Sequence, residues 1–179
     1  MNTYKMTIAG LERELPIFPV SENVSIAAFI LFGDPEITVA SAKELLKKVP
    51  EFDVILTPEA KSIPLAHEMS RQSGKTYIVA RKGPKLYMGE SFSVEVKSIT
   101  TYKSQKLYIG EYDVEAIKGK RVLIVDDVIS TGESLKAIQK LAEKAGANVV
   151  ASAAVLAEGA ASERDDIIFL EPLPLITEE

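Results

Sequence analysis

Two adjacent carboxylates and a hydroxyl-rich turn are the residues of this chain with the clearest chemistry. The apolar run Val122–Val125 leads directly into Asp126 and Asp127. A Ser-Thr-Gly turn follows, and the pattern predicts that a helix begins near Glu133. Carboxylates accept hydrogen bonds from vicinal hydroxyl groups and bind Mg²⁺ through oxygen. Backbone N–H groups at a helix N-terminus favour an anion. The segment is therefore predicted to hold a ribose at one end and its 5′-phosphate at the other.

A plain strand–turn–helix connection, with Ser or Thr as the helix N-cap, is the alternative interpretation. It explains one hydroxyl residue but not two neighbouring carboxylates followed by a Thr-Gly turn. The sequence contains neither a G-x-x-x-x-G-K-[ST] loop nor a G-x-G-x-x-G motif. The predicted ribose and phosphate contacts are Asp126, Asp127, Val128, Ser130, Thr131, Gly132, Glu133 and Ser134.

The elements that must position these residues follow an α/β pattern. Apolar strands are expected at 53–56, 76–80, 122–125, 149–156 and 167–170, and amphipathic helices at 40–49, 64–70 and 133–145. This alternation predicts a Rossmann-like parallel sheet flanked by helices on both faces. Ligands of such sheets bind at the carboxyl ends of the strands. The residues that follow Leu56, Ala80, Val125 and Leu156 are therefore expected to meet in one crevice.

Two further loops leave strands at that edge. Glu59–Ser62 follows the first strand, where its backbone amides and Lys61 are suited to a second anion. Arg81, Lys82 and Lys85 follow the next strand, and three cations at one strand end fit a diphosphate. The alternatives are a surface role for Lys61 and, for the three cations, an electrostatic contact with another partner.

The ends of this pattern are less regular. The first 35 residues are expected to be irregular apart from a short strand around Tyr4–Ile8 and to form a small hood. Alternating residues at 92–96 and 107–109 predict a hairpin whose basic tip, 97–106, is a flexible lid or an ordinary exposed turn. We expect one domain, 1–179, with a hood region 1–39 and a core 40–179 that includes the lid hairpin 91–110.

The composition of the chain limits the kinds of partner and chemistry that we expect. The chain has 179 residues, a net charge of -5 and no cysteine, which argues against binding of duplex nucleic acid and against thiol chemistry. The longest apolar run, Val149–Ala157, is too short to span a bilayer. There is no signal-peptide pattern, so we expect no membrane partner and a cytoplasmic location. His67, the only histidine, is expected to be structural.

The segment VLIVDDVISTGES resembles the phosphoribosyl pyrophosphate (PRPP) signature of the type I phosphoribosyltransferases. Thr57–Ile63 resembles the pyrophosphate loop of the purine members, and Val79–Leu86 resembles their next strand end. The resemblance covers about residues 50–160 and is greatest to the adenine and xanthine enzymes. It implies the fold of that family, PRPP and a purine base as substrates, Mg²⁺ as cofactor and a homodimer.

The resemblance also implies roles for individual residues. Asp126 and Asp127 would be catalytic, holding the ribose hydroxyls and the metal through water or substrate. The pyrophosphate contacts would be Glu59, Ala60, Lys61, Ser62, Arg81, Lys82 and Lys85. Glu95 stands at the position of the catalytic glutamate of the adenine enzymes; the alternative is that it is simply the outward residue of a strand. The lid residues would be Ser98, Thr100 and Lys103.

The base that is used stays open in the sequence. Residues 96–100 resemble the loop of the xanthine enzymes more closely, whereas the short C-terminus favours adenine. Phe18, Ile26 and Phe29 of the hood and the strand end at 156–159, which begins with Leu156, are the expected base contacts. A PRPP or nucleotide sensor without turnover is the alternative function. It would gain support if Glu133, which replaces a small residue of many relatives, pointed at the phosphate.

Overall fold

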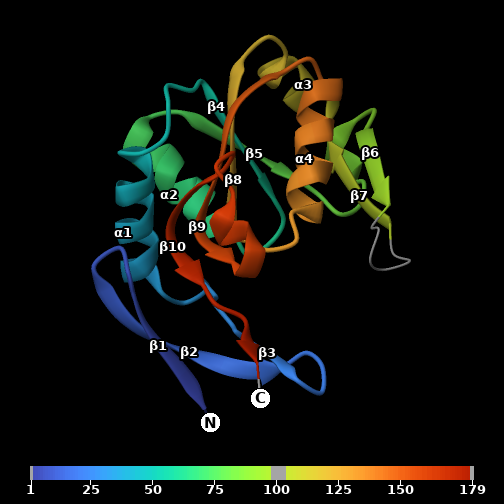
Figure 1. Ribbon diagram of the computed structural model, residues 1–179. Coiled ribbons are helices and arrows are strands. Elements are labelled where there is room, and N and C mark those ends of the chain that lie inside the picture. Colours follow the sequence, from blue (N-terminus) through green and yellow to red (C-terminus); the bar gives the residue numbers. More distant parts are fainter. Residues whose placement is uncertain (1, 98–103, 178–179) are drawn as a thin grey trace.

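A five-stranded parallel sheet forms the centre of the molecule in the computed structural model, which describes residues 2–97 and 104–177 (Figure 1). Its order is β10-β9-β8-β4-β5. The strands are β4 (Val54–Pro58), β5 (Thr76–Ala80), β8 (Arg121–Ile129), β9 (Asn148–Glu158) and β10 (Ile168–Leu173). The chain runs outward from β4 to β5 on one side and from β8 to β10 on the other. The strand order therefore reverses between β4 and β8, where open α/β sheets bind their ligands.

Helices cover both faces of this sheet, as the alternation of elements predicted (Figure 1). On one face α1 (Pro35–Leu46) and α2 (Ile63–Ser73) pack against each other and against the inward side chains of β4, β8 and β9. On the other face lie α4 (Glu133–Lys144) and the short α3 (Glu111–Ile117). Ile117 of α3 is buried in the hydrophobic core on this face, together with the apolar side chains of α4. The predicted Rossmann-like sheet with flanking helices is confirmed.

Helix α1 begins at Pro35, five residues before the predicted start at Ala40. The side chain of Asp34 accepts a hydrogen bond from the N–H of Ile37 at 3.1 Å and so caps the first turn. Pro35 then occupies the first helical position, where its missing N–H costs no hydrogen bond. The Asp-Pro pair at 34–35 is therefore the N-terminal signal of this helix.

Strand β8 is longer than predicted, because it continues through the two aspartates. The prediction ended the strand at Val125, whereas Val128 and Ile129 still pair with Leu156 and Ala157 of β9. Asp126 and Asp127 are thus strand residues whose side chains leave opposite faces of the sheet.

The hood is a sheet, so the expectation of an irregular N-terminal region was wrong. Its order is β1-β2-β3-β11, with β1 (Thr3–Ile8), β2 (Leu11–Pro19), β3 (Val24–Ala27) and β11 (Ile176–Thr177). The tight turn at Ala9 and Gly10 has positive φ at both residues, the geometry of two-residue hairpins. Because β11 pairs with β3, the hood sheet uses both ends of the chain (Figure 1).

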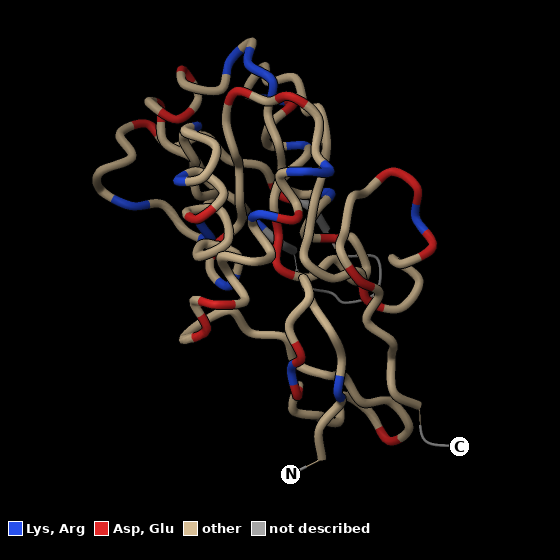
Figure 2. The backbone as a smooth tube through the Cα atoms, turned by 90° about the vertical axis from the view of Figure 1, so that its left-hand side faces the viewer, with Lys and Arg blue, Asp and Glu red and all other residues tan. Residues whose placement is uncertain are grey.

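The expected hairpin is formed by β6 (Phe92–Lys97) and β7 (Ser104–Ile109). The predicted lid residues Ser98, Thr100 and Lys103 lie outside the described residues. Two short 3₁₀ turns, η1 (Leu86–Met88) and η2 (Gly159–Glu163), complete the chain. Basic and acidic positions are interspersed along the described backbone (Figure 2). Within the described ranges, no helix is long and apolar enough to cross a membrane.

Candidate active site

A cavity of about 460 Å³ opens at the carboxyl ends of β4 and β8. It lies where the strand order reverses, as expected for a doubly wound sheet. Its walls come from the β4–α2 loop, the end of β8 and the turn before α4. The lining residues are Pro58, Glu59, Ala60, Lys61, Ser62, Lys82, Leu107, Asp126, Asp127, Val128, Ile129, Ser130, Thr131, Gly132, Ser134 and Leu135. The structure thus brings together residues that are up to 77 positions apart in the chain.

The turn before α4, residues 130–134, forms one end of this cavity and is called the phosphate turn below. Gly132 is the N-cap residue of α4 and has a φ of 80°, a left-handed conformation that suits glycine. Thr131, Gly132 and Ser134 line the cavity, whereas Glu133 does not. The helix N-terminus therefore faces the cavity with backbone N–H groups and hydroxyls, and the glutamate is set outside the lining.

The two aspartates occupy different environments. Asp127 is buried, with 3% of its surface exposed, and the Nζ atom of Lys61 lies 2.9 Å from its Oδ2 atom. Asp126 is half-buried, and its Oδ1 atom accepts a hydrogen bond from the backbone N–H of Asp127 at 2.9 Å. Burial, and after it the negative charge of Asp127, raises the pKa of Asp126 well above its ordinary value. Two neighbouring carboxyl groups at the cavity can accept hydrogen bonds from hydroxyl groups or bind a cation.

Buried polar contacts of Thr57 and Ser62 hold the β4–α2 loop in place. The Oγ1 atom of Thr57 lies 2.8 Å from the Oγ atom of Ser62 and 2.7 Å from the carbonyl oxygen of Val125. Ser62 donates to the carbonyl oxygen of Pro58 at 2.9 Å. The peptide bond between Glu59 and Ala60 is cis. These contacts join β4, its loop and β8, and sequence reasoning missed them because Thr57 and Val125 are 68 positions apart.

Of the three predicted cations after β5, only Lys82 lines the cavity. Arg81 is engaged by Glu59 and by the hydroxyl of Tyr87. Burial of Glu59 opposes its ionisation, but the hydrogen bond and charge of Arg81 outweigh burial and hold the pKa of Glu59 below its ordinary value. Arg81 therefore anchors the loop residue Glu59 in this state, and Lys85 stands apart from the lining.

A second cavity of about 270 Å³ adjoins the first on the hood side and shares Lys61, Val128 and Ser130 with it. Its remaining walls are mainly apolar residues of the hood. They are Ile26, Ala27, Ala28, Phe29, Ile30, Glu158 and Leu173.

The expected base contacts are distributed unevenly around this second cavity. Ile26 and Phe29 belong to its wall, whereas Phe18 is exposed and Leu156 is fully buried in the core. Glu158 was not singled out by sequence reasoning, although it lies in the strand end at 156–159.

Two other candidates lie away from both cavities. Glu95 is an exposed residue of β6, opposite Lys106 of β7, and lines neither cavity. His67 is exposed on α2 and makes an edge-to-face contact with Tyr77, with 5.8 Å between ring centroids. That contact agrees with the structural role expected for His67.

The carboxylates fit a metal only in part. No group of three or more Asp, Glu or His residues that could hold an ion occurs within the described ranges. Two carboxylates nevertheless border the cavity, and the buried Oδ2 atom of Asp127 already lies beside a cation, the Nζ atom of Lys61. Mg²⁺ is commonly bound by one or two carboxylates together with substrate phosphates and water. The donor set therefore fits a metal that arrives with a phosphorylated substrate.

Comparison with known proteins identifies the family. The phosphoribosyl transferase domain matches residues 36–174. A hypoxanthine/guanine phosphoribosyltransferase of Methanosarcina acetivorans is 33% identical over 162 residues, which are 90% of this chain and 79% of that protein. An adenine phosphoribosyltransferase of Bifidobacterium longum is 35% identical over 152 residues, covering 80% of this chain and 74% of that protein.

Solved structures agree with the sequence relatives. The adenine phosphoribosyltransferase of Thermoanaerobacter pseudethanolicus superimposes with a TM-score of 0.73 at 25% identity, over 88% of this chain and 95% of that one. The adenine phosphoribosyltransferase of Saccharomyces cerevisiae, solved with adenine and an imino-altritol bisphosphate, gives a TM-score of 0.68 at 24% identity over 88% of this chain and 92% of that one, and so supports the fold. The family match, these relatives and the doubly wound sheet with its acidic strand end place the chain in the type I phosphoribosyltransferase family, in its purine branch.

Proposed function

We propose that this protein transfers ribose 5-phosphate from PRPP to a purine base, giving a nucleoside monophosphate and pyrophosphate in purine salvage. The observation that carries the proposal is the junction of the two cavities. The first joins an acidic strand end, a phosphate turn and a lysine-bearing loop, and the second offers an apolar site beside them. A ribose carrying anions at both ends fits the first cavity, and a flat base fits the second.

The chain's own residues would act mainly by positioning and by charge. Asp126 and Asp127 would accept hydrogen bonds from the ribose hydroxyls, while the phosphate turn binds the 5′-phosphate. Lys61 and Lys82, which line the same cavity, would stabilise the charge of the departing pyrophosphate. Departure leaves an oxocarbenium-like centre at C1, which the base attacks. Exclusion of water protects this centre, and the β6–β7 hairpin, whose Leu107 lines the cavity, is the element placed to provide it.

Mg²⁺ is the proposed cofactor, held by Asp126 and Asp127 through water or through the substrate. When bound, it would neutralise charge on the diphosphate. Glu95 stays a candidate for proton transfer from the base, and its exposed position on β6 means that closure of the hairpin would have to bring it to the site.

Adenine is the preferred base in this proposal. Glu158 places a carboxylate on the wall of the second cavity, whose hood residues are apolar. A carboxylate accepts a hydrogen bond from an exocyclic amino group, whereas it repels a carbonyl oxygen. The amino group of adenine satisfies this requirement, and hypoxanthine has none. Guanine also carries an amino group and is the informative competitor.

Assembly and location belong to the same proposal. Leu86 and Tyr87, just after the pyrophosphate-side loop at 81–85, are exposed, Tyr87 to 70%. Exposed apolar residues of this kind suit contact with a second copy, so we propose a homodimer, measurable by sedimentation equilibrium. A chain without cysteine is compatible with the reducing cytoplasm.

The proposal is tested by mixing the protein with PRPP, Mg²⁺ and adenine, guanine, hypoxanthine or xanthine in turn, and following monophosphate formation. Turnover should be fastest with adenine and should be lost in an Asp127→Asn control. PRPP binding by calorimetry without turnover on any of the four bases would instead support the sensor function. Glu133 does not line the cavity, so the sensor alternative gains no support from the lining.

A further inference from the structure

The phosphate turn lacks a cation of its own. Residues 130–134 contain no Lys or Arg, and they include Glu133. A ribose 5′-phosphate carries close to two negative charges at neutral pH. Backbone N–H groups and the helix dipole supply part of the compensation, equivalent to about half a positive charge. The proposed function therefore leaves this turn short of positive charge.

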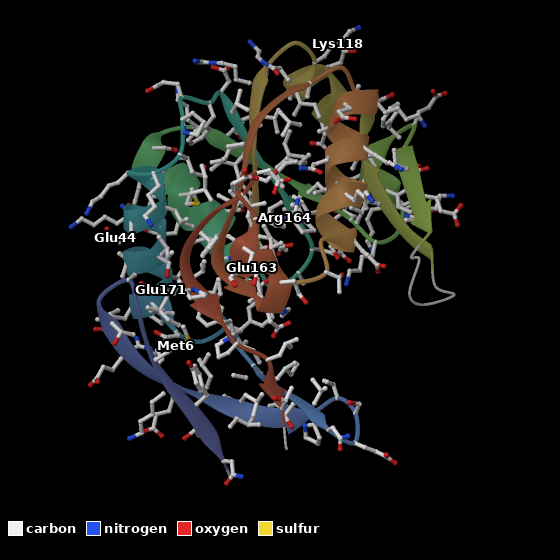
Figure 3. All side chains as sticks on the ribbon, in the orientation of Figure 1. Met6, Glu44, Lys118, Glu163, Arg164 and Glu171 are labelled. Atoms are coloured by element: carbon white, nitrogen blue, oxygen red, sulfur yellow. The ribbon has the colours of Figure 1, made fainter. Side chains whose placement is uncertain are left out.

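Arg164 approaches the turn from a distant part of the chain. Its Nη1 atom lies 2.6 Å from the point that a β-carbon on Gly132 would occupy. Arg164 follows η2, and Figure 3 shows it between η2 and the lower end of α4. The turn and the arginine are 32 residues apart, so the sequence motif gave no indication of the contact.

The guanidinium of Arg164 is held in one orientation. Its Nε and Nη2 atoms donate to the two carboxylate oxygens of Asp166 at 2.8 and 2.7 Å. The backbone of Arg164 is also fixed, because its N–H donates to the carbonyl oxygen of the buried Ala161 at 3.2 Å. With two of its nitrogens occupied by Asp166, the guanidinium presents Nη1 to Gly132. This bidentate geometry is specific to arginine.

We propose that Arg164 is a positioning residue for the 5′-phosphate, supplying the phosphate turn with positive charge and supporting it at Gly132. The inference rests on the proposed function, since it assumes that the turn binds a phosphorylated ribose. It predicts that replacement of Arg164 weakens binding only at the 5′-phosphate end of the substrate. Lys61 and Lys82 line the cavity and are the residues proposed to bind pyrophosphate, so pyrophosphate binding should not depend on Arg164.

The experiment compares ribose 5-phosphate with pyrophosphate as separate ligands. In Arg164→Gln, the Kd for ribose 5-phosphate should rise about five- to tenfold, as expected for loss of one partly exposed charge interaction. The Kd for pyrophosphate should stay within about twofold of the parent. In turnover, the KM for PRPP should rise while the kcat and the KM for adenine stay close to those of the parent. Arg164→Lys keeps the charge without the fork and should show a smaller loss.

Arg121 offers a matched control. It makes the same two-point contact with Asp53, from Nε and Nη2 at 3.1 and 2.8 Å. It stands at the first residue of β8, roughly 25 Å along the strand from the cavity end. Arg121→Gln should therefore leave the Kd values of both ligands unchanged. This control separates an effect at the turn from the loss of any arginine–aspartate pair.

Unchanged ribose 5-phosphate binding in Arg164→Gln, or equal losses for the two ligands, would overturn the inference. Circular dichroism identifies a variant that fails to fold, in which case Arg164→Lys carries the same comparison. If the parent protein binds neither ribose 5-phosphate nor PRPP, the proposed function fails instead. Ligand binding by the parent protein therefore distinguishes failure of the proposed function from failure of the inference about Arg164.

Discussion

The Nζ atom of Lys61 lies 2.9 Å from the Oδ2 atom of Asp127, so a cation of the β4–α2 loop neutralises the buried carboxylate of β8. Lys61 lies in the loop that follows β4, and Asp127 lies in β8; β4 and β8 flank the point where the sheet order reverses. In the proposed reaction Asp127 faces the ribose and Lys61 faces the pyrophosphate. This ion pair therefore links the two ends of the proposed substrate site.

Replacement of Lys61 by Gln should lower kcat/KM for PRPP at least about tenfold, equivalent to ~1.4 kcal/mol. The reason is that the variant loses positive charge where the leaving group departs. Lys61→Arg, which retains the charge, should keep most of the activity. Steady-state rates at varied PRPP measure the effect, and equal kcat/KM in Lys61→Gln and the parent would contradict a role in pyrophosphate binding.

Replacement of Asp126 by Asn should stabilise the ligand-free protein by about 1 kcal/mol and reduce turnover about a hundredfold or more. Asn removes a carboxyl whose ionisation is opposed first by burial and then by repulsion from the negative charge of Asp127, and its side-chain oxygen still accepts the hydrogen bond from the backbone N–H of Asp127. Urea unfolding at neutral pH without Mg²⁺ measures the stability. A destabilised variant would show that the repulsion is already compensated in the native protein.

Replacement of Thr57 by Val should cost about 1–3 kcal/mol in the free energy of unfolding. The change keeps the shape but removes the hydroxyl that joins Ser62 to the carbonyl oxygen of Val125. Thr57→Ser retains that hydroxyl and serves as the control. Chemical denaturation of both variants decides the matter, and equal stability of Thr57→Val and the parent would mean that the contact contributes little.

The pair between Asp34 and Arg13 should make stability depend on pH. The hydrogen bond from Arg13 lowers the pKa of Asp34 below its ordinary value. A carboxyl whose pKa is lowered in the folded state stabilises the protein above the unfolded pKa of about 3.9. This contribution is lost as the pH falls through the folded value.

Asp34→Asn keeps an N-cap side chain and removes only the negative charge, so it measures the contribution of the ion pair. Asp34→Ala also removes the cap, at a further cost of about 1 kcal/mol in the free energy of unfolding. The difference in unfolding free energy between Asp34→Asn and the parent should be full at neutral pH and should shrink as the pH falls below the unfolded pKa of about 3.9. A difference that is constant across this range would refute the contribution of the ion pair.

Replacement of Glu158 by Gln should narrow the preference between purines. The amide keeps an acceptor but adds a donor, so it accommodates the carbonyl of hypoxanthine, which the carboxylate repels. We expect the ratio of kcat/KM for adenine to that for hypoxanthine to fall roughly tenfold, within the range of one polar contact. Competition assays with both bases measure it, and an unchanged ratio would remove Glu158 from base selection.

The sequence by itself determined the sheet class and the principal site. Continuous apolar strands alternating with amphipathic helices can bury their surfaces only as a covered parallel sheet. The strand-end rule then located the ends of β4 and β8, and residues 59–62 and 126–132 do line one cavity. These are local patterns, since each depends on neighbours within a few residues.

Only the tertiary structure decided the rest. The length of β8 depends on pairing with β9, and the hood became a sheet because β11, from the other end of the chain, pairs with β3. The placement of Arg164 beside Gly132 depends on how two distant segments pack. Such contacts leave no periodic or local signal, because they are selected by the packing of the whole chain and not by the propensities of neighbouring residues.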